Sequence, residues 1–156
     1  DRMVREGRWA SGGKLPLGTR LGGRKLGILG LGQIGRAIAR RAEAFDADIL
    51  YWNRSDIETP SNWTRAETPE RLAARSDILV AAVAATPQTE NLVSAAVLEA
   101  LGGVGIFVNV ARGNVVDEAA LLHALQNGGI AAAGDRLNKN AIVTVTVAPH
   151  SPKTAV

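Results

Sequence analysis

The stretch Lys25–Phe45, KLGILGLGQIGRAIARRAEAF, decides the fold. It begins with a short apolar run, passes through Gly30, Gly32 and Gly35, and continues with apolar residues at helical spacing. This spacing predicts an inward apolar face formed by Ile34, Ala37, Ile38 and Ala42. The opposite, polar face is formed by Arg36, Arg40, Arg41 and Glu43. The stretch therefore predicts a strand, a tight glycine turn and a helix.

The rest of the chain repeats this unit of strand and helix. Further strands are predicted at residues 47–52, 77–83, 105–110, 130–134 and 141–147, and further helices at 68–76, 94–101 and 117–125. Thr68 and Asp117 are the expected N-caps of two of these helices. The strands are continuous apolar runs, which is typical of a sheet covered on both faces. We therefore expect an α/β fold, a Rossmann-type doubly wound parallel sheet in a single domain.

The first 23 residues do not belong to this pattern. They are rich in glycine and charge without a sustained period, and they predict a short helical turn at residues 4–9 followed by an irregular arm. The chain thus divides into an arm, 1–23, and a dinucleotide-binding domain, 24–156. Because the chain opens on Asp1 and not on Met, we expect a processed or excised piece of a longer protein.

The composition excludes several classes of function. Apolar residues make up 46% and charged residues 21% of the 156 residues, as in a globular domain. The absence of cysteine removes disulfides, thiolate catalysis and cysteine-based zinc sites, and it fits a cytoplasmic protein. No apolar run approaches the roughly 18 residues of a membrane span. The net charge of +3 is spread along the chain without a nucleic-acid-binding motif, so we expect no metal, nucleic acid or membrane partner.

The glycine turn has the GxGxxG spacing of a dinucleotide-binding loop. Gly30 allows the tight turn, Gly32 lets a pyrophosphate approach the backbone, and Gly35 lets the helix pack on its strand. The start of the helix, at Gln33 and Ile34, then faces the anion. These five residues are candidate cofactor-binding residues because the motif lies between a strand and a helix, and the alternative is a purely structural turn.

The second strand ends on Asn53, Arg54 and Ser55, where NAD-binding domains often place an acid that binds the ribose. Asn53 does not repel a phosphate, Arg54 can fork onto one, and Ser55 can donate one more hydrogen bond. This ending predicts a preference for NADP, with NAD as the weaker cofactor. The alternative is that Arg54 is a solvated loop residue. The acids Asp56 and Glu58 lie close by and could blunt the preference.

Four segments resemble the D-isomer-specific 2-hydroxyacid dehydrogenases. They are GLGQIGRAIARRAEAF, ATPQTENLV, NVARGNVVDEAAL and APH, at residues 30–45, 85–93, 109–121 and 148–150. The resemblance runs from about Arg5 to Ala132. The NRS ending of the second strand is similar to that of the NADP-preferring glyoxylate and hydroxypyruvate reductases of the family.

The resemblance implies roles for particular residues. Arg112 emerges at the carboxyl edge of the sheet and would hold and polarise a 2-oxo acid, or the corresponding 2-hydroxy acid, while His150 would donate the proton. The resemblance also implies that the chain forms a homodimer, with the arm wrapping over the partner. His123 lies within a predicted helix, and we assign it no catalytic role. The cofactor-binding residues implied by the resemblance are Thr86, Pro87, Thr89, Ala111 and Asp135.

The sequence departs from the family in two ways. The position of the family's catalytic glutamate falls on Asn140, which can hold an imidazole but supplies no negative charge. The substrate domain that closes over the nicotinamide is also absent. Three hypotheses stay open: an NADP-linked reductase of small 2-oxo acids such as glyoxylate or hydroxypyruvate, a truncated or engineered cofactor-binding module without turnover, and a domain that binds another nucleotide or serves in assembly.

Overall fold

The computed structural model describes residues 5, 7, 20–138 and 141–144, with side chains through residue 134. Most of the expected helical turn at 4–9 and of the 1–23 arm lies outside the described residues, as do Asn140 and His150. The strands are β1 (Lys25–Leu29), β2 (Asp48–Trp52), β3 (Thr64–Arg65), β4 (Ile78–Ala81), β5 (Ile106–Asn109), β6 (Ala132–Asn138) and β7 (Ala141–Thr144). The helices are α2 (Gln33–Glu43), α3 (Pro69–Ala74), α4 (Ala95–Leu101) and α5 (Glu118–Gln126), with short 3₁₀ turns η1 (Pro87–Thr89) and η2 (Gly113–Val115).

The strands form one sheet in the order β3-β2-β1-β4-β5-β6-β7. Every pairing from β3 to β6 is parallel, which confirms the doubly wound α/β architecture. Two features differ from the sequence prediction. β3 was not predicted, because two residues are too short for a periodic signal. The last strand, β7, pairs antiparallel with β6, so the sheet is parallel only through β6.

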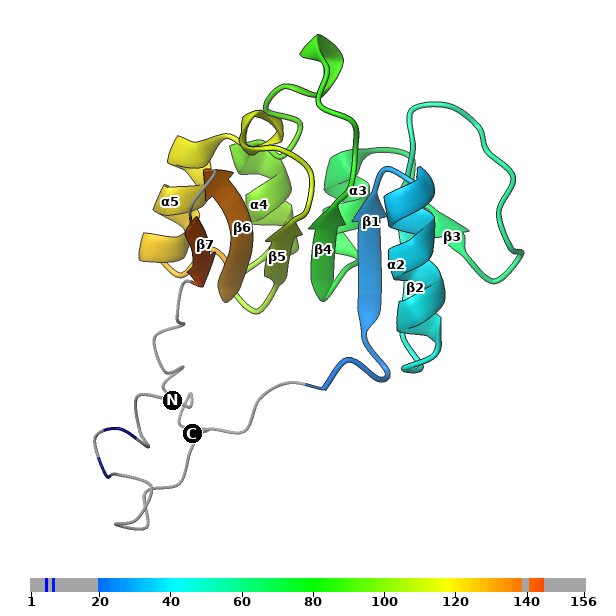
Figure 1. Ribbon diagram of the computed structural model, residues 1–156, viewed down its shortest axis with the longest axis horizontal. Coiled ribbons are helices and arrows are strands. Elements are labelled where there is room, and N and C mark those ends of the chain that lie inside the picture. Colours follow the sequence, from blue (N-terminus) through cyan, green and yellow to red (C-terminus); the bar gives the residue numbers. More distant parts are fainter. Residues whose placement is uncertain (1–4, 6, 8–19, 139–140, 145–156) are drawn as a thin grey trace, which may run out of the picture.

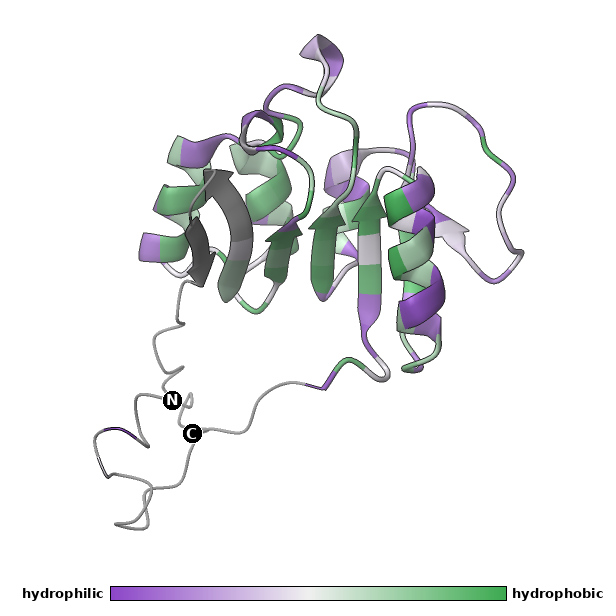
Figure 2. Ribbon diagram, in the orientation of Figure 1, coloured by the Kyte–Doolittle hydropathy of each residue, from purple (hydrophilic) through white to green (hydrophobic). Residues whose placement is uncertain are grey.

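Two layers of helices cover the sheet (Figure 1). α2 packs on the face formed by residues such as Leu26 and Ile28, while α3 and α4 pack on the other face, around Leu29 and Phe107. Figure 2 shows that apolar residues concentrate in β1, β4 and β5 and that polar residues colour much of α2. Within the described residues, no helix has both the length and the apolar character of a membrane span.

The order of the strands determines where a ligand can bind. β1 pairs with β2 on one side and with β4 on the other, so the chain reverses its direction of winding between β1 and β4. The loops that follow β2, β4 and β5 all rise from the same edge of the sheet (Figure 1). A crevice at the carboxyl ends of the strands beside such a reversal is the usual ligand site of an open α/β sheet.

Candidate functional site

The three glycines of the turn have different surroundings. Gly30 has φ +91°, and a Cβ built there would lie 2.7 Å from Cγ1 of Val83, two residues after β4. A Cβ on Gly35 would collide with the carbonyl oxygen of Gly30. Nothing lies within 4 Å of a Cβ built on Gly32. Gly30 and Gly35 therefore allow close packing, whereas Gly32 keeps open the space above the turn.

Helix α2 begins at this open space. Gly32 is its N-cap, no side chain caps it within the described part of the chain, and its first turn contains no acidic residue. The amides of the first turn are therefore available to an anion. Ile34 was expected to face inward, but its side chain is 58% exposed. Of the predicted inward face, Ala42 is buried and Ile38 packs against the core, together with the buried Gly35 and Ala39, whereas Ile34 lines the crevice.

Two adjoining hollows lie along the carboxyl edge of the sheet, with volumes of about 260 and 520 Å³. Small-molecule sites typically measure about 300–1,000 Å³, so the two hollows together have the volume of one ligand site with two compartments. The Arg54 hollow is lined by Gly30, Gly32, Trp52, Asn53, Arg54, Ser55, Ala82, Val83, Ala84, Thr86, Gln88 and Thr89. The Arg112 hollow is lined by Gly32, Gln33, Ile34, Ala82, Val83, Ala84, Ala85, Val110, Ala111 and Arg112.

The two hollows meet at Gly32 and at residues 82–84, which line both of them. The structure thus brings together most of the cofactor-binding residues predicted from the sequence. Gly35 and Pro87 line neither hollow. The backbone of Asp135 pairs with Asn109 in the sheet, and its side chain lies outside the described part. His150, the predicted proton donor, also lies outside the described residues.

Asn53 joins the end of β2 to the glycine turn. Its Oδ1 accepts a hydrogen bond from the backbone N–H of Leu31 at 3.3 Å, and its Nδ2 donates to the carbonyl oxygen of Ser55 at 2.9 Å. The amide also donates to Oγ of Ser55 at 3.3 Å. Both ends of the Asn53 side chain therefore shape the rim of the hollow, while Arg54 is exposed there.

The turn after β4 is held by its own threonines. The backbone N–H of Thr86 donates to Oγ1 of Thr89 at 2.8 Å, and that hydroxyl donates to the carbonyl oxygen of Ala84 at 2.7 Å. Pro87 occupies the first position of η1, where a missing N–H costs nothing. The predicted Thr86 to Thr89 turn therefore forms a rigid wall of the Arg54 hollow.

Arg112 is placed by a buried residue that the sequence reasoning missed. Asn109, the last residue of β5, is only 4% exposed. Its Oδ1 accepts from the N–H of Ala111 at 2.9 Å, and its Nδ2 donates to the carbonyl oxygen of Arg112 at 3.1 Å. A buried polar side chain at the carboxyl end of a strand was the signal that could have identified it.

Backbone pairing ties the two loops behind the crevice together. The N–H of Val93 donates to the carbonyl oxygen of Val115 at 3.0 Å, and the N–H of Asp117 donates to that of Val93 at 3.1 Å. Val93 and Val115 are fully buried. The loops after β4 and β5 are therefore linked by backbone hydrogen bonds, and Arg112 lies on the second of these loops.

His123 is exposed on α5, at a separate hollow between α4 and α5, which agrees with its assignment as a helix-face residue. Among the described residues, no group of acidic and histidine side chains could hold a metal ion.

The parts of the crevice fit a dinucleotide. Its centre is a glycine with open space above it, beside an uncapped helix start, and one arginine lines each hollow. Together with the strand order, these features define a Rossmann-type dinucleotide-binding domain.

The comparisons with known proteins name the family. The model of the D-isomer specific 2-hydroxyacid dehydrogenase, NAD binding domain, matches residues 1–152, and the chain belongs to this family. The chain is 41% identical over 153 residues to glyoxylate/hydroxypyruvate reductase A of Arabidopsis thaliana, covering 98% of this chain and 46% of the relative. It is 43% identical over 134 residues to hydroxyphenylpyruvate reductase of Plectranthus scutellarioides, covering 86% and 42%.

A solved structure agrees with the fold. The NADPH-dependent glyoxylate/hydroxypyruvate reductase of Sinorhizobium meliloti, solved with NADP and malonate, superimposes with a TM-score of 0.81 at 46% identity. The match covers 89% of this chain and 44% of that one. The chain thus spans less than half the length of these relatives, and it corresponds to their nucleotide-binding part.

Proposed function

We propose that this chain is the NADP-binding domain of a reductase that transfers hydride from NADPH to a small 2-oxo acid of the glyoxylate or hydroxypyruvate type. The observation that carries the proposal is the ending of β2, where Arg54 and Ser55 line a hollow that continues past Gly32 to Arg112. A guanidinium forks onto a phosphate with charge-assisted hydrogen bonds, which the ribose hydroxyl of NAD cannot match. The similar reductase solved with NADP supports this cofactor.

In this proposal, the chain's own residues bind the cofactor and orient the substrate. The open face of Gly32 and the start of α2 take the pyrophosphate, and the Arg54 hollow takes the phosphorylated adenosine. A bound NADPH supplies the hydride. Arg112 holds the substrate carboxylate and offsets negative charge at the carbonyl oxygen, and His150 remains the predicted proton donor.

A test of binding is thermal unfolding of the chain with NADPH, NADH or S-adenosylmethionine at equal concentration. A ligand at 100 times its dissociation constant stabilises the folded state by about 2.7 kcal/mol. We expect the largest rise in melting temperature with NADPH and a smaller one with NADH. Stabilisation by S-adenosylmethionine alone would favour a domain for another nucleotide, and no shift with any ligand would favour a role in assembly.

The alternative proposal for the chain taken alone is a cofactor-binding module without turnover. More than half of the similar reductase's length has no counterpart in this chain, and hydride transfer needs a closed cleft that holds the reactants together. Steady-state oxidation of NADPH with glyoxylate separates the two readings. We expect the chain to bind NADPH without measurable turnover. Turnover by the native chain that Arg112→Ala abolishes would reject the module without turnover.

We also propose a homodimer, to which the 1–23 arm contributes, and a cytoplasmic location. The dimer is supported by the resemblance alone, and light scattering that returned a 16.3 kDa particle would contradict it. The location is supported by the lack of cysteine, and recovery of the protein outside the cytoplasmic fraction would contradict it.

A further inference from the structure

The segment after β2, residues 53–59, carries an acid close to the proposed phosphate site. Asp56 comes two residues after Arg54, and its side chain is 90% exposed. A carboxylate this close to a bound phosphate would oppose it through like-charge repulsion. The sequence alone therefore predicts that Asp56 weakens the preference for NADP.

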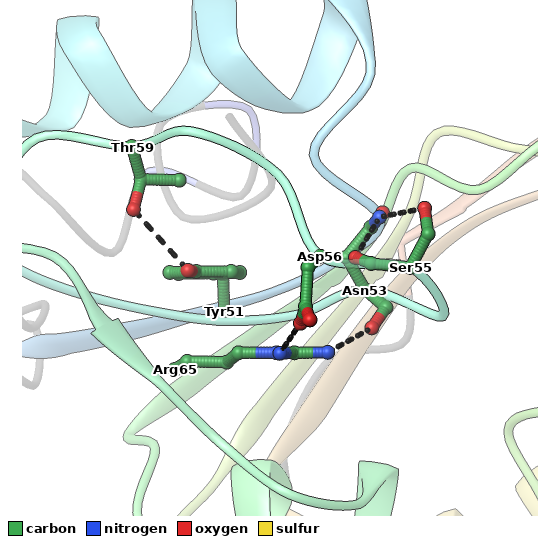
Figure 3. Close-up of polar contacts among 6 residues, drawn as sticks. All are labelled: Tyr51, Asn53, Ser55, Asp56, Thr59 and Arg65. Carbon is green, nitrogen blue, oxygen red and sulfur yellow. Dashed lines mark hydrogen bonds and ion pairs between the residues drawn. The ribbon is translucent and has the colours of Figure 1, made fainter.

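An arginine of β3 forms an ion pair with Asp56. Arg65 lies in β3, whose register places it beside Tyr51 of β2. Its Nη1 forms an ion pair with Oδ1 of Asp56, and its Nη2 donates to the carbonyl oxygen of Asn53 at 3.2 Å. Figure 3 shows the guanidinium contacting both ends of the 53–56 turn. Arg65 therefore contacts residues on both sides of Arg54, although it lies outside the 53–59 segment.

Other contacts already hold the far end of the segment. Nη2 of Arg36 donates to the carbonyl oxygen of Glu58 at 2.8 Å, and the hydroxyls of Tyr51 and Thr59 lie 3.2 Å apart in a hydrogen bond (Figure 3). These contacts anchor residues 58 and 59 without Arg65. The contribution of Arg65 is thus local to the turn that carries Arg54 and to the charge of Asp56.

We propose that Arg65 is a positioning and specificity-determining residue for the cofactor. It neutralises Asp56 and holds the carbonyl of Asn53, and by doing so it keeps the Arg54 hollow electropositive toward a phosphate. This inference rests on the proposed NADP-binding function. A planar guanidinium suits the task because it serves two acceptors in a fixed fork. Exposed ion pairs add little to folding stability, so the consequence of this pair is the local charge.

The experiment measures the dissociation constants of NADPH and NADH for the full chain by quenching of tryptophan fluorescence. Trp52 lines the Arg54 hollow, so we expect its fluorescence to respond to a bound cofactor. The variants are Arg65→Ala, Asp56→Asn and their combination, and the control is Arg75→Ala. Arg75 is an exposed arginine at the end of α3. It shortly precedes the start of β4 and therefore lies near the amino edge of the sheet, away from the two hollows at the carboxyl edge.

We expect Arg65→Ala to weaken NADPH binding by roughly two- to fivefold and to leave NADH binding unchanged, because only NADPH carries the phosphate. Adding Asp56→Asn should restore most of the loss. Arg75→Ala should change neither constant. An equal loss for both cofactors would reduce Arg65 to a structural residue, and a loss that Asp56→Asn does not restore would overturn charge neutralisation. Either result overturns the inference.

A further variant, Arg54→Ala, separates this inference from the function on which it rests. If Arg54→Ala abolishes the preference for NADPH while Arg65→Ala does not change it, only the role of Arg65 fails. If neither the native chain nor Arg54→Ala distinguishes NADPH from NADH, the proposed cofactor itself fails. In that case Arg65 has no specificity to determine.

Discussion

At the scale of single residues, two buried or half-buried asparagines shape the crevice. Asn53 ties the end of β2 to Leu31 of the glycine turn, and Asn109 ties the end of β5 to the backbone of residues 111 and 112. In both side chains, the amide oxygen and the amide nitrogen each have a hydrogen-bond partner within the protein. Asn53 is predicted as a cofactor-binding residue that does not repel a phosphate, and its hydrogen bonds to Ser55 also order the segment on which Arg54 and Ser55 lie.

The residue-scale prediction concerns Asn109→Ala. It removes both hydrogen bonds of a buried side chain and leaves the N–H of Ala111 without a partner, since Ala111 is itself buried. We expect a loss of about 1–3 kcal/mol in the free energy of unfolding, measured by urea denaturation. Asn114→Ala, at an exposed position, is the matched control and should be nearly neutral. An unchanged midpoint for Asn109→Ala would show that the turn does not depend on this side chain.

At the scale of elements, the sequence predicted the glycine turn and most helices and strands. Thr68 and Asp117 accept hydrogen bonds from the backbone N–H groups of Arg71 and Ala120, as their positions before α3 and α5 predicted. The local pattern could not identify β3 or the direction of β7. Both depend on pairing with distant strands, and β3 has only two residues. Arg65 was missed for the same reason.

The element-scale prediction compares two glycines of one turn. In Gly35→Ala, the new Cβ meets the carbonyl oxygen of Gly30, so α2 must move away from β1, at a cost of about 1–3 kcal/mol in the free energy of unfolding. In Gly32→Ala, the new Cβ enters open space, so folding is kept while NADPH binding is lost. Urea denaturation and fluorescence titration of both variants check this. Full NADPH affinity in Gly32→Ala would contradict the assigned path of the pyrophosphate.

At the scale of the whole molecule, the sheet reverses its winding beside a continuous pair of hollows, and the chain is the nucleotide-binding part of a larger family architecture. The site residues cluster because the carboxyl ends of parallel strands share one edge, which is why GxGxxG, the end of β2 and Arg112 could be joined from the sequence. The shape of the substrate site could not be predicted in this way. The chain spans less than half the length of the relatives that it matches.

The most direct test of the account is the ratio of the dissociation constants of NADH and NADPH for the native chain and for Arg54→Ala. Each charge-assisted hydrogen bond contributes roughly 1.5–3 kcal/mol, so removing Arg54 should weaken NADPH binding about tenfold to a hundredfold and leave NADH binding nearly unchanged. We predict that the native chain prefers NADPH and that this preference disappears in Arg54→Ala. Equal affinity of the native chain for both cofactors, or a preference that survives without Arg54, would contradict it.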